Sequence, residues 1–220
     1  FPVFAMNWTD PKTGELTQGF REKGFLPEAF INMLAVLGWN DGSEQELFTM
    51  DELISKFSIE RVHKGGAKFD YEKAKWFNHQ YLVRKSDDEL AQLFSKELTV
   101  KGIVCELPKL ALIVSMVKER VSFVHELWGQ TSFFFEAPAA YDEKVAQKRW
   151  KDDVPSFMLE LAQLFDHQTQ WQGEALKHEA AELITAKSQN FGNIMNALRL
   201  ALVGGSFGPD LFTIVELLGK

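Results

Sequence analysis

The chain has 220 residues, of which 45% are hydrophobic and 25% are charged, and its formal net charge is −7 at pH 7. This length suits one large domain or two to three small ones, and the apolar content is sufficient for a core. No apolar run approaches the length of a membrane span, and no signal-peptide pattern is present. The single Cys105 excludes an internal disulfide and a cysteine-based zinc site, which favours a reduced, cytoplasmic setting.

The negative charge argues against a general nucleic-acid binder, because such proteins are usually basic. It leaves room for a protein that concentrates a few arginines on one face. The sequence begins at Phe1 rather than at a methionine and ends at Lys220, directly after an apolar helical pattern. We therefore expect a fragment of a longer protein.

The first helix is predicted in residues 24–39, after a turn signal at residues 10–14. Pro27 suits a first helical turn, where its missing N–H costs nothing. Phe30 and later apolar residues recur at helical spacing, which predicts an amphipathic helix. Gly38 is a candidate for a left-handed residue that ends this helix.

Capping patterns mark the start of later helices. Thr49 and Glu52 have the spacing of a capping box that opens a helix to about Phe57, and Ser86 and Glu89 repeat this spacing.

A further helix is expected after Asp70, with Trp76 and Phe77 on its buried face. An apolar helix is predicted in residues 107–117. The aromatic run 133–135 could form a strand, but it is too short to imply a sheet. For most of these aromatic residues and Trp128 we favour a place in the core over stacking on RNA.

From Tyr141 the pattern is helical nearly to the end of the chain. Pro155 is expected to bend or break the first of these helices, since proline removes a backbone donor. The following helices are predicted at residues 173–187, at residues 193–203 before a glycine pair, and after Asp210. The predicted fold class is mainly α.

The chain offers weak signals for catalysis. Residues 204–208 match the G-x-S-x-G pattern around Ser206, but that motif requires a preceding strand and here a helix is predicted. No histidine follows Ser206, so a glycine turn between helices is the better interpretation. No glycine-rich nucleotide loop and no H-E-x-x-H is present. The histidines, which show no compact metal-ligand spacing, are His63, His79, His125, His167 and His178.

Several segments resemble parts of bacterial glutamyl-tRNA synthetases. GFLPEAFINMLAVLGW at residues 24–39 is similar to a segment that follows the family's catalytic domain. FDYEKAKWFN at residues 69–78 resembles its stem-contact region, NALRLALVG at residues 196–204 its LRxALxG segment, and GPDLF at residues 208–212 the GPxLF stretch that follows. The resemblance runs through nearly the whole chain.

The resemblance implies three helical parts. These are a stem-contact region in residues 1–85 and two small anticodon-binding units in residues 86–138 and 139–220. The implied partner is the tRNA for glutamate, and a monomer without DNA or membrane binding is expected. The parent enzyme would attach glutamate to this tRNA with ATP and Mg²⁺ in its catalytic domain. The family's catalytic loop is absent here, so this chain is expected to be inactive alone and to hold no cofactor.

The resemblance also selects site residues. Arg120 and Arg199 correspond to the family's anticodon-facing arginines, and an arginine fork suits the polar edge or the flat face of an exposed base. The turn that packs against the anticodon bases is expected to include Gly208, Pro209, Leu211 and Phe212. Phosphate contacts are expected from a basic set, and no catalytic or metal-binding residue is predicted. The basic set is Lys118, Lys144, Lys148, Arg149 and Lys151.

A function of another class stays open at this point. The helical fragment could be a protein-interaction module whose negative surface recruits a basic partner and which binds no RNA. Each arginine could instead form an ordinary surface ion pair, although we favour contact with the anticodon. Basic residues such as those in 144–151 more often form a solvated face than a phosphate-binding track.

Overall fold

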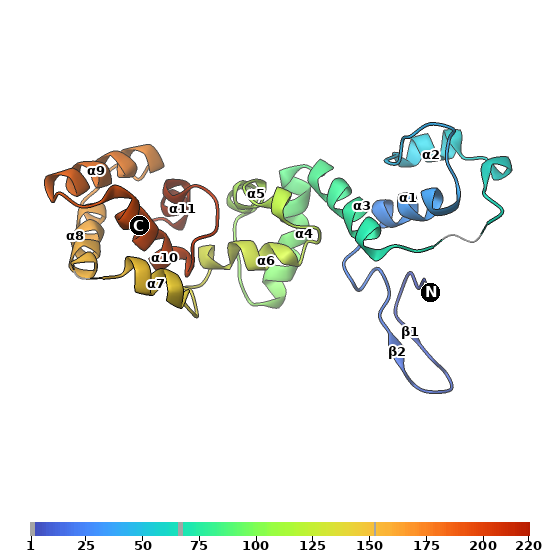
Figure 1. The fold of residues 1–220 in the computed structure, drawn as a ribbon, viewed down its shortest axis with the longest axis horizontal. Helices are drawn as coiled ribbons and strands as arrows, with labels where there is room; N and C mark the ends of the chain where they lie inside the picture. The colour runs from blue at the N-terminus through green and yellow to red at the C-terminus, as the bar shows by residue number, and fades with distance from the viewer. Residues whose placement is uncertain (1–2, 66–67, 152) are drawn as a thin grey trace. The chain divides into compact units, whose positions relative to one another are not determined.

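The computed structural model describes residues 3–65, 68–151 and 153–220, and it divides the chain into two compact units (Figure 1). Unit 1 is Phe1–Leu127 and unit 2 is Trp128–Lys220. Among the described residues, helices dominate and one two-stranded sheet is present, which confirms the prediction of a mainly α fold.

Unit 1 begins with a hairpin and continues through helices. Its elements are β1 (Trp8–Thr9), β2 (Leu16–Thr17), α1 (Pro27–Gly38), α2 (Met50–Lys56), the 3₁₀ turn η1 (Ile59–Arg61), α3 (Tyr71–Arg84), α4 (Asp87–Val100), α5 (Leu107–Ser115) and the 3₁₀ turn η2 (Lys118–Arg120). Helix α6 (Glu126–Thr131) carries the chain across the division.

Unit 2 is also helical in its described residues. Its elements are the 3₁₀ turn η3 (Ser132–Phe134), α7 (Glu143–Arg149), α8 (Val154–Asp166), α9 (Gly173–Ala186), α10 (Phe191–Val203) and α11 (Leu211–Leu218). Helix α9 contacts α8, α10 and α11, and a buried cluster that includes Phe157, Leu176, Ile194 and Phe212 fills the space between them.

The turn predicted at residues 10–14 is confirmed as the tip of the hairpin. The Asp10 carboxylate accepts from the N–H of Lys12 at 2.7 Å, and Gly14 adopts a left-handed φ of 72°. The two strands pair antiparallel on either side of this turn.

Helix α1 begins with Pro27 in its first turn, as predicted, but the predicted role of Gly38 is wrong. Gly38 is the last helical residue and has no positive φ. The chain instead leaves the helix through Trp39 in an extended conformation. The Trp39 side chain is 1% exposed and its ring lies 5.5 Å from Phe48 and 5.4 Å from Phe57 between centroids. This packing, rather than a glycine cap, ends the helix.

The predicted caps are confirmed. Thr49 and Glu52 form a complete capping box at α2, and Ser86 and Glu89 form another at α4. The Asp70 carboxylate accepts from two backbone N–H groups in the first turn of α3. Each cap satisfies donors that the helix itself leaves unpaired.

On α3, Trp76 and Phe77 were both predicted to lie on the buried face, and this prediction is correct for one of them. Phe77 is fully buried between α3 and α1, whereas Trp76 is 40% exposed and lies edge-on to Phe77. Neighbouring residues point about 100° apart on a helix, so both cannot face the same partner. Phe77 belongs to a cluster with Phe20, Phe25 and Met33 that forms a core of unit 1.

Two further expectations in unit 2 are corrected. The aromatic run is not a strand, since residues 132–134 form η3 with Phe133 and Phe134 buried. Pro155 does not break a helix, because it lies in the first turn of α8, where no helical donor is lost.

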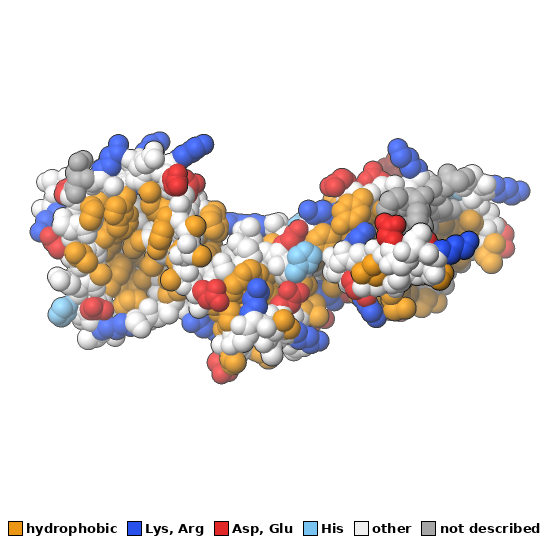
Figure 2. All heavy atoms as spheres, turned by 90° about the horizontal axis from the view of Figure 1, so that it is seen from below, with side chains coloured by type: hydrophobic (Ala, Val, Ile, Leu, Met, Phe, Trp, Pro, Cys, Tyr) orange, Lys and Arg blue, Asp and Glu red, His pale blue; other side chains and the backbone are white. Residues whose placement is uncertain are grey.

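No helix among the described residues is both long and apolar enough to span a bilayer. Figure 2 shows hydrophobic side chains gathered over one face of unit 2, with lysine and arginine side chains at its margin.

Candidate functional site

Arg199 on α10 holds the turn that connects α10 to α11. Its Nη1 atom donates to the carbonyl of Phe207 at 3.0 Å and to the carbonyl of Pro209 at 2.8 Å. One guanidinium nitrogen therefore bridges two backbone acceptors of the turn that the sequence singled out.

The turn can pass this close to Arg199 because Gly208 lacks a side chain. Gly208 has a left-handed φ of 104°, and a Cβ at this position would lie 3.4 Å from Nη1 of Arg199. Pro209 is buried beside it and supplies one of the two carbonyls. Of the predicted site residues, Arg199, Gly208 and Pro209 thus form one connected structure.

A pocket of about 200 Å³ opens beside this turn. Arg199, Leu211 and Phe212 take part in its lining, so the structure brings together three of the residues predicted to bind the anticodon. The other lining residues are Lys177, Phe191, Met195, Asn196 and Asp210. The pocket combines cations, a carboxylate, an amide and an aromatic ring, which suits a flat ring with a polar edge.

Leu211 and Phe212 contribute mainly as the wall of this pocket. They are 5% and 4% exposed and belong to the buried cluster of unit 2. Their contact with a ligand is therefore limited to the few atoms that reach the surface.

Asp210 begins α11 and carries a stabilised negative charge. Its carboxylate accepts from the N–H groups of Phe212 and Thr213, each at 3.0 Å. Burial raises the pKa of the Asp210 carboxyl, but these hydrogen bonds outweigh burial, and the pKa is lowered from its ordinary value. Asp210 therefore stays ionised at neutral pH and stabilises the helix N-terminus.

Lys177 and Phe191 are pocket residues that the sequence did not reveal. Lys177 lies on α9, and Phe191 is the first residue of α10 with its side chain 46% exposed. Neither belongs to a motif, because tertiary packing alone brings α9 beside α10 and α11. An exposed phenylalanine at a helix start is the only local signal that could have drawn attention to this place.

Arg120 lies in unit 1, at the end of η2, with its side chain exposed. Two polar side chains of α3, Asn78 and His79, hold the backbone that follows Arg120. The fully buried Asn78 donates from Nδ2 to the Ser122 carbonyl at 2.5 Å, and Nδ1 of His79 lies 2.7 Å from the Val121 carbonyl. Asn78 also accepts from the N–H of Leu26 at 2.7 Å.

The other side of this segment is held by Glu126. Its carboxylate accepts from the N–H of Ser122 at 2.6 Å and of Phe123 at 3.2 Å. Arg120 is therefore presented at the surface next to a backbone that is hydrogen-bonded on both sides.

The predicted phosphate-binding residues fall into two groups. In unit 1, Lys118 lies 2.8 Å from an Asp87 carboxylate oxygen and its side chain is 20% exposed, so much of its charge is already compensated. In unit 2, α7 and the residues after it carry the other four. Arg149 contacts the Asn193 side chain at 3.5 Å. The exposed members are Lys144, Lys148 and Lys151.

The described residues show no metal-binding cluster. Within them, no group of three or more His, Cys, Asp or Glu side chains is placed to hold a metal ion. Ser206 follows a helix rather than a strand, and Gly204 ends that helix in a left-handed conformation with φ of 81°. This is the glycine turn that the sequence predicted, and it lacks the strand that a nucleophile elbow requires.

Comparison with known proteins shows which protein families this chain resembles. Residues 73–220 match a model described as "Anticodon binding domain", and residues 12–76 match "tRNA synthetases class I (E and Q), catalytic domain". The whole chain is 52% identical to a glutamate–tRNA ligase of Porphyromonas gingivalis and 50% identical to one of Phocaeicola vulgatus, covering 44% of each.

A solved structure is similar throughout. A crystal structure of a glutamate tRNA ligase from Elizabethkingia meningosepticum matches with a TM-score of 0.90 and 41% identity, over all of this chain and 43% of that one. The chain spans less than half the length of these relatives. The matches do not favour the alternative of a protein-interaction module. The chain belongs to the glutamate–tRNA ligase family and carries its anticodon-binding domain.

Proposed function

We propose that this chain binds the tRNA for glutamate and reads its anticodon with Arg120 of unit 1 and with the Arg199 pocket of unit 2. The observation that carries this proposal is the pocket in which Arg199, Leu211 and Phe212 meet beside the Gly208 turn. An unpaired base offers a flat face and a polar edge, and this lining offers apolar walls and charged groups that match them.

The guanidinium of Arg199 has a double role in this proposal. Nη1 holds the turn, and Arg199 also takes part in the lining of the pocket. Arg120, by contrast, extends from a fixed backbone into solvent, where it can adapt to a base or a phosphate.

Phosphate contacts are proposed for the exposed lysines of unit 2, Lys144, Lys148 and Lys151, with Arg149 beside them. The Lys118 pairing with Asp87 makes it the weakest candidate in the basic set. A few such contacts are consistent with a chain of net charge −7, because phosphate binding depends on local rather than total charge.

For the longer protein, we propose ATP-dependent attachment of glutamate to this tRNA, with Mg²⁺ bound outside the present chain. We also propose a cytoplasmic monomer that binds neither DNA nor membranes, and we keep the division into residues 1–85, 86–138 and 139–220 as a proposal. The 220-residue chain alone is expected to charge no tRNA when supplied with glutamate, ATP and Mg²⁺. Charging above a protein-free control would contradict this expectation.

The proposed function is tested first by a binding titration against salt. Glutamate tRNA is titrated with the chain at several salt concentrations, and log K is plotted against log salt concentration. A slope that corresponds to several displaced counterions supports RNA binding, whereas a flat response or no binding contradicts the proposal.

Reading of the anticodon is tested with Arg120→Ala, Arg199→Ala and Arg199→Lys. If each arginine contacts a base edge, its loss should reduce discrimination between glutamate tRNA and anticodon-substituted transcripts by about 1–3 kcal/mol. Loss of a phosphate contact would instead weaken all transcripts equally and lower the salt slope by about one unit. Arg199→Lys keeps the positive charge but removes the planar guanidinium group with its paired hydrogen-bond donors. Wild-type discrimination in all three variants would show that these arginines are not the readers.

A further inference from the structure

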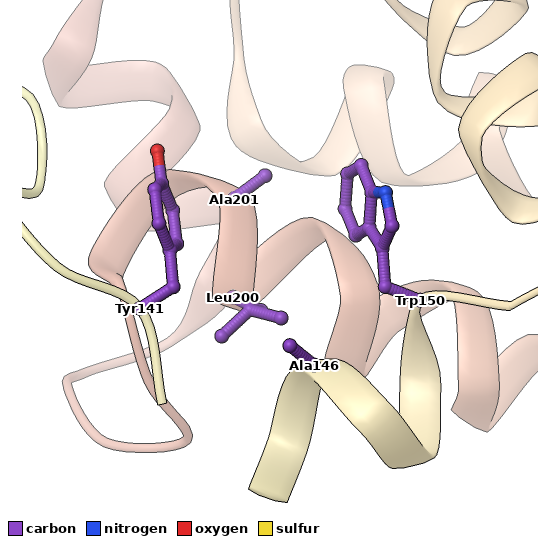
Figure 3. A pocket seen from close by; sticks show the side chains of 5 residues that line it. All are labelled: Tyr141, Ala146, Trp150, Leu200 and Ala201. Atoms are coloured by element: carbon purple, nitrogen blue, oxygen red, sulfur yellow. The ribbon is translucent and has the colours of Figure 1, made fainter. Parts of the chain in front are cut away.

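A second pocket of unit 2, of about 320 Å³, lies between α7 and α10. Its lining residues are all aromatic or aliphatic: Tyr141, Ala146, Trp150, Leu200 and Ala201. In Figure 3 the rings of Tyr141 and Trp150 stand on opposite sides of the pocket, with the Leu200 and Ala201 side chains between them. We call this feature the aromatic slot. Its volume lies at the lower end of the range for small-ligand pockets, about 300–1,000 Å³.

The aromatic slot is separate from the Arg199 pocket. Arg199 and Ala201 are two residues apart on α10, and two helical steps turn the side-chain direction by about 200°. The two pockets therefore lie on different faces of the same helix, and Tyr141, Trp150 and Ala201 have no part in the lining of the Arg199 pocket.

Both walls of the slot are anchored. The N–H of Asp142 donates to the Gly204 carbonyl at 2.8 Å, which ties the residue after Tyr141 to the end of α10. On the other wall, the N–H of Trp150 donates to Ala146 at 2.8 Å, and the Asn193 side chain donates to the Arg149 carbonyl at 3.4 Å. The backbone on both sides of the slot is thus held by hydrogen bonds within unit 2.

Both rings are exposed to solvent. Tyr141 is 51% exposed and Trp150 is 37% exposed. Two exposed rings on opposite sides of a pocket present flat apolar faces that a third ring can cover, and nucleobases stack on aromatic side chains in this way. Trp150 also lies between Arg149 and Lys151 in the chain, and these cations suit the phosphates on either side of a stacked base.

We propose that the aromatic slot binds one unpaired nucleobase of the bound tRNA, stacked between Tyr141 and Trp150. This inference rests on the proposed tRNA binding. The lining offers only a phenol hydroxyl and an indole N–H as polar side-chain groups, so the slot holds a base by its face and does not identify it. A proline-rich or aromatic peptide would also fit an apolar slot, but the adjacent cations favour a phosphodiester chain.

The test uses glutamate tRNA that carries 2-aminopurine at one unpaired position at a time, titrated with the 220-residue chain. Stacking quenches this fluorophore. We expect quenching at one position, its loss in Trp150→Ala, and its retention in Trp150→Phe, which keeps an aromatic face. Trp150→Ala should also weaken binding of every anticodon transcript by about tenfold, without a change in discrimination between them. Leu159→Ala removes an apolar side chain that is 68% exposed on α8 and serves as the matched control.

The outcomes separate the two proposals. Failure of the wild-type chain to bind tRNA would overturn the proposed function and the slot with it. Wild-type binding without any quenching that depends on Trp150 would overturn the slot alone. A loss of anticodon discrimination in Trp150→Ala would also overturn it, because the slot would then be reading bases.

Discussion

Arg199 serves both the stability of the protein and the proposed recognition of tRNA. Its two hydrogen bonds to the Phe207 and Pro209 carbonyls hold the turn that shapes the pocket. Arg120 has an exposed side chain on η2, and the backbone after it is fixed by Asn78 and Glu126 instead. Equal substitutions at the two arginines should therefore have unequal effects on folding.

Arg199→Ala should lower the free energy of unfolding by about 1–3 kcal/mol, because two hydrogen bonds of a charged group are lost, one exposed and one partly buried. Arg120→Ala should change it by no more than about 0.5 kcal/mol, as is usual for exposed positions. Urea denaturation followed by circular dichroism measures both values. Equal stability of the two variants would show that the Arg199 bridge contributes nothing to the turn.

Asp41 makes the stability of its loop dependent on pH. The Ser43 hydroxyl and then the Lys56 ammonium bind its carboxylate and lower the pKa of Asp41 from 3.8 to about 2. Because the folded-state pKa lies below the ordinary value, this stabilisation is present above pH 4 and is lost as the pH falls towards 2.

The expected result is a resolved titration of the Asp41 carboxyl near pH 2 by NMR. Asp41→Asn should lose less stability than the wild type between pH 4 and pH 2, since the substituted side chain does not titrate. Parallel acid unfolding of the two proteins would contradict this assignment.

The end of α10 depends on a glycine, and α6 offers a matched comparison. Gly204 has φ of 81°, and a Cβ there would lie 2.7 Å from the Ala140 carbonyl oxygen. Gly129, within α6, has no atom within 4 Å of the corresponding position.

Gly204→Ala should destabilise the protein by about 2 kcal/mol or more, from backbone strain and the clash together. Gly129→Ala should stabilise it by about 0.5–1 kcal/mol, because alanine is the better helix former. Thermal unfolding of the two variants provides the measurement. A neutral Gly204→Ala would mean that the 138–142 segment moves away at little cost.

The elements that the sequence predicted well are those with local causes. The capping boxes at Thr49 and Ser86, Pro27 in a first turn and Gly204 at a helix end all depend on residues a few positions apart. Gly38 was misjudged because its helix is ended by the burial of Trp39 against residues that are distant in sequence.

The residues of the candidate site also differ in whether the sequence could predict them. Arg199 and the 208–212 turn are close in the chain and fall within family-like strings, so sequence could select them. Lys177 joins their pocket from α9, and Tyr141 meets α10 only through the fold. No spacing rule connects such residues, and only tertiary packing places them together.

Unit 2 has a hydrophobic cluster composed entirely of its own residues. Leu176 on α9 is a fully buried member of it, together with side chains from α8, α10 and α11. A cluster within residues 73–220, the range of the anticodon-binding match, gives this part of the protein its own source of stability.

Leu176→Ala should cost about 2–5 kcal/mol, because it removes buried methyl groups and leaves a cavity. Hydrogen exchange should become faster in α8, α9, α10 and α11, while amides of α1 and α3 keep their protection. Mass-spectrometric exchange on both proteins measures this. Equal loss of protection in α1 and α3 would show that the two units unfold as one.

The buried amide of Asn78 also sets an order of events during synthesis on the ribosome. It accepts from Leu26, 52 residues earlier, and donates to Ser122, 44 residues later. At about 5–20 residues per second, Ser122 is made roughly 2–9 s after Asn78. During that interval the Nδ2 donor of Asn78 lacks the acceptor that it has in the folded structure. The surface that presents Arg120 can be completed only when the growing chain supplies its last acceptor.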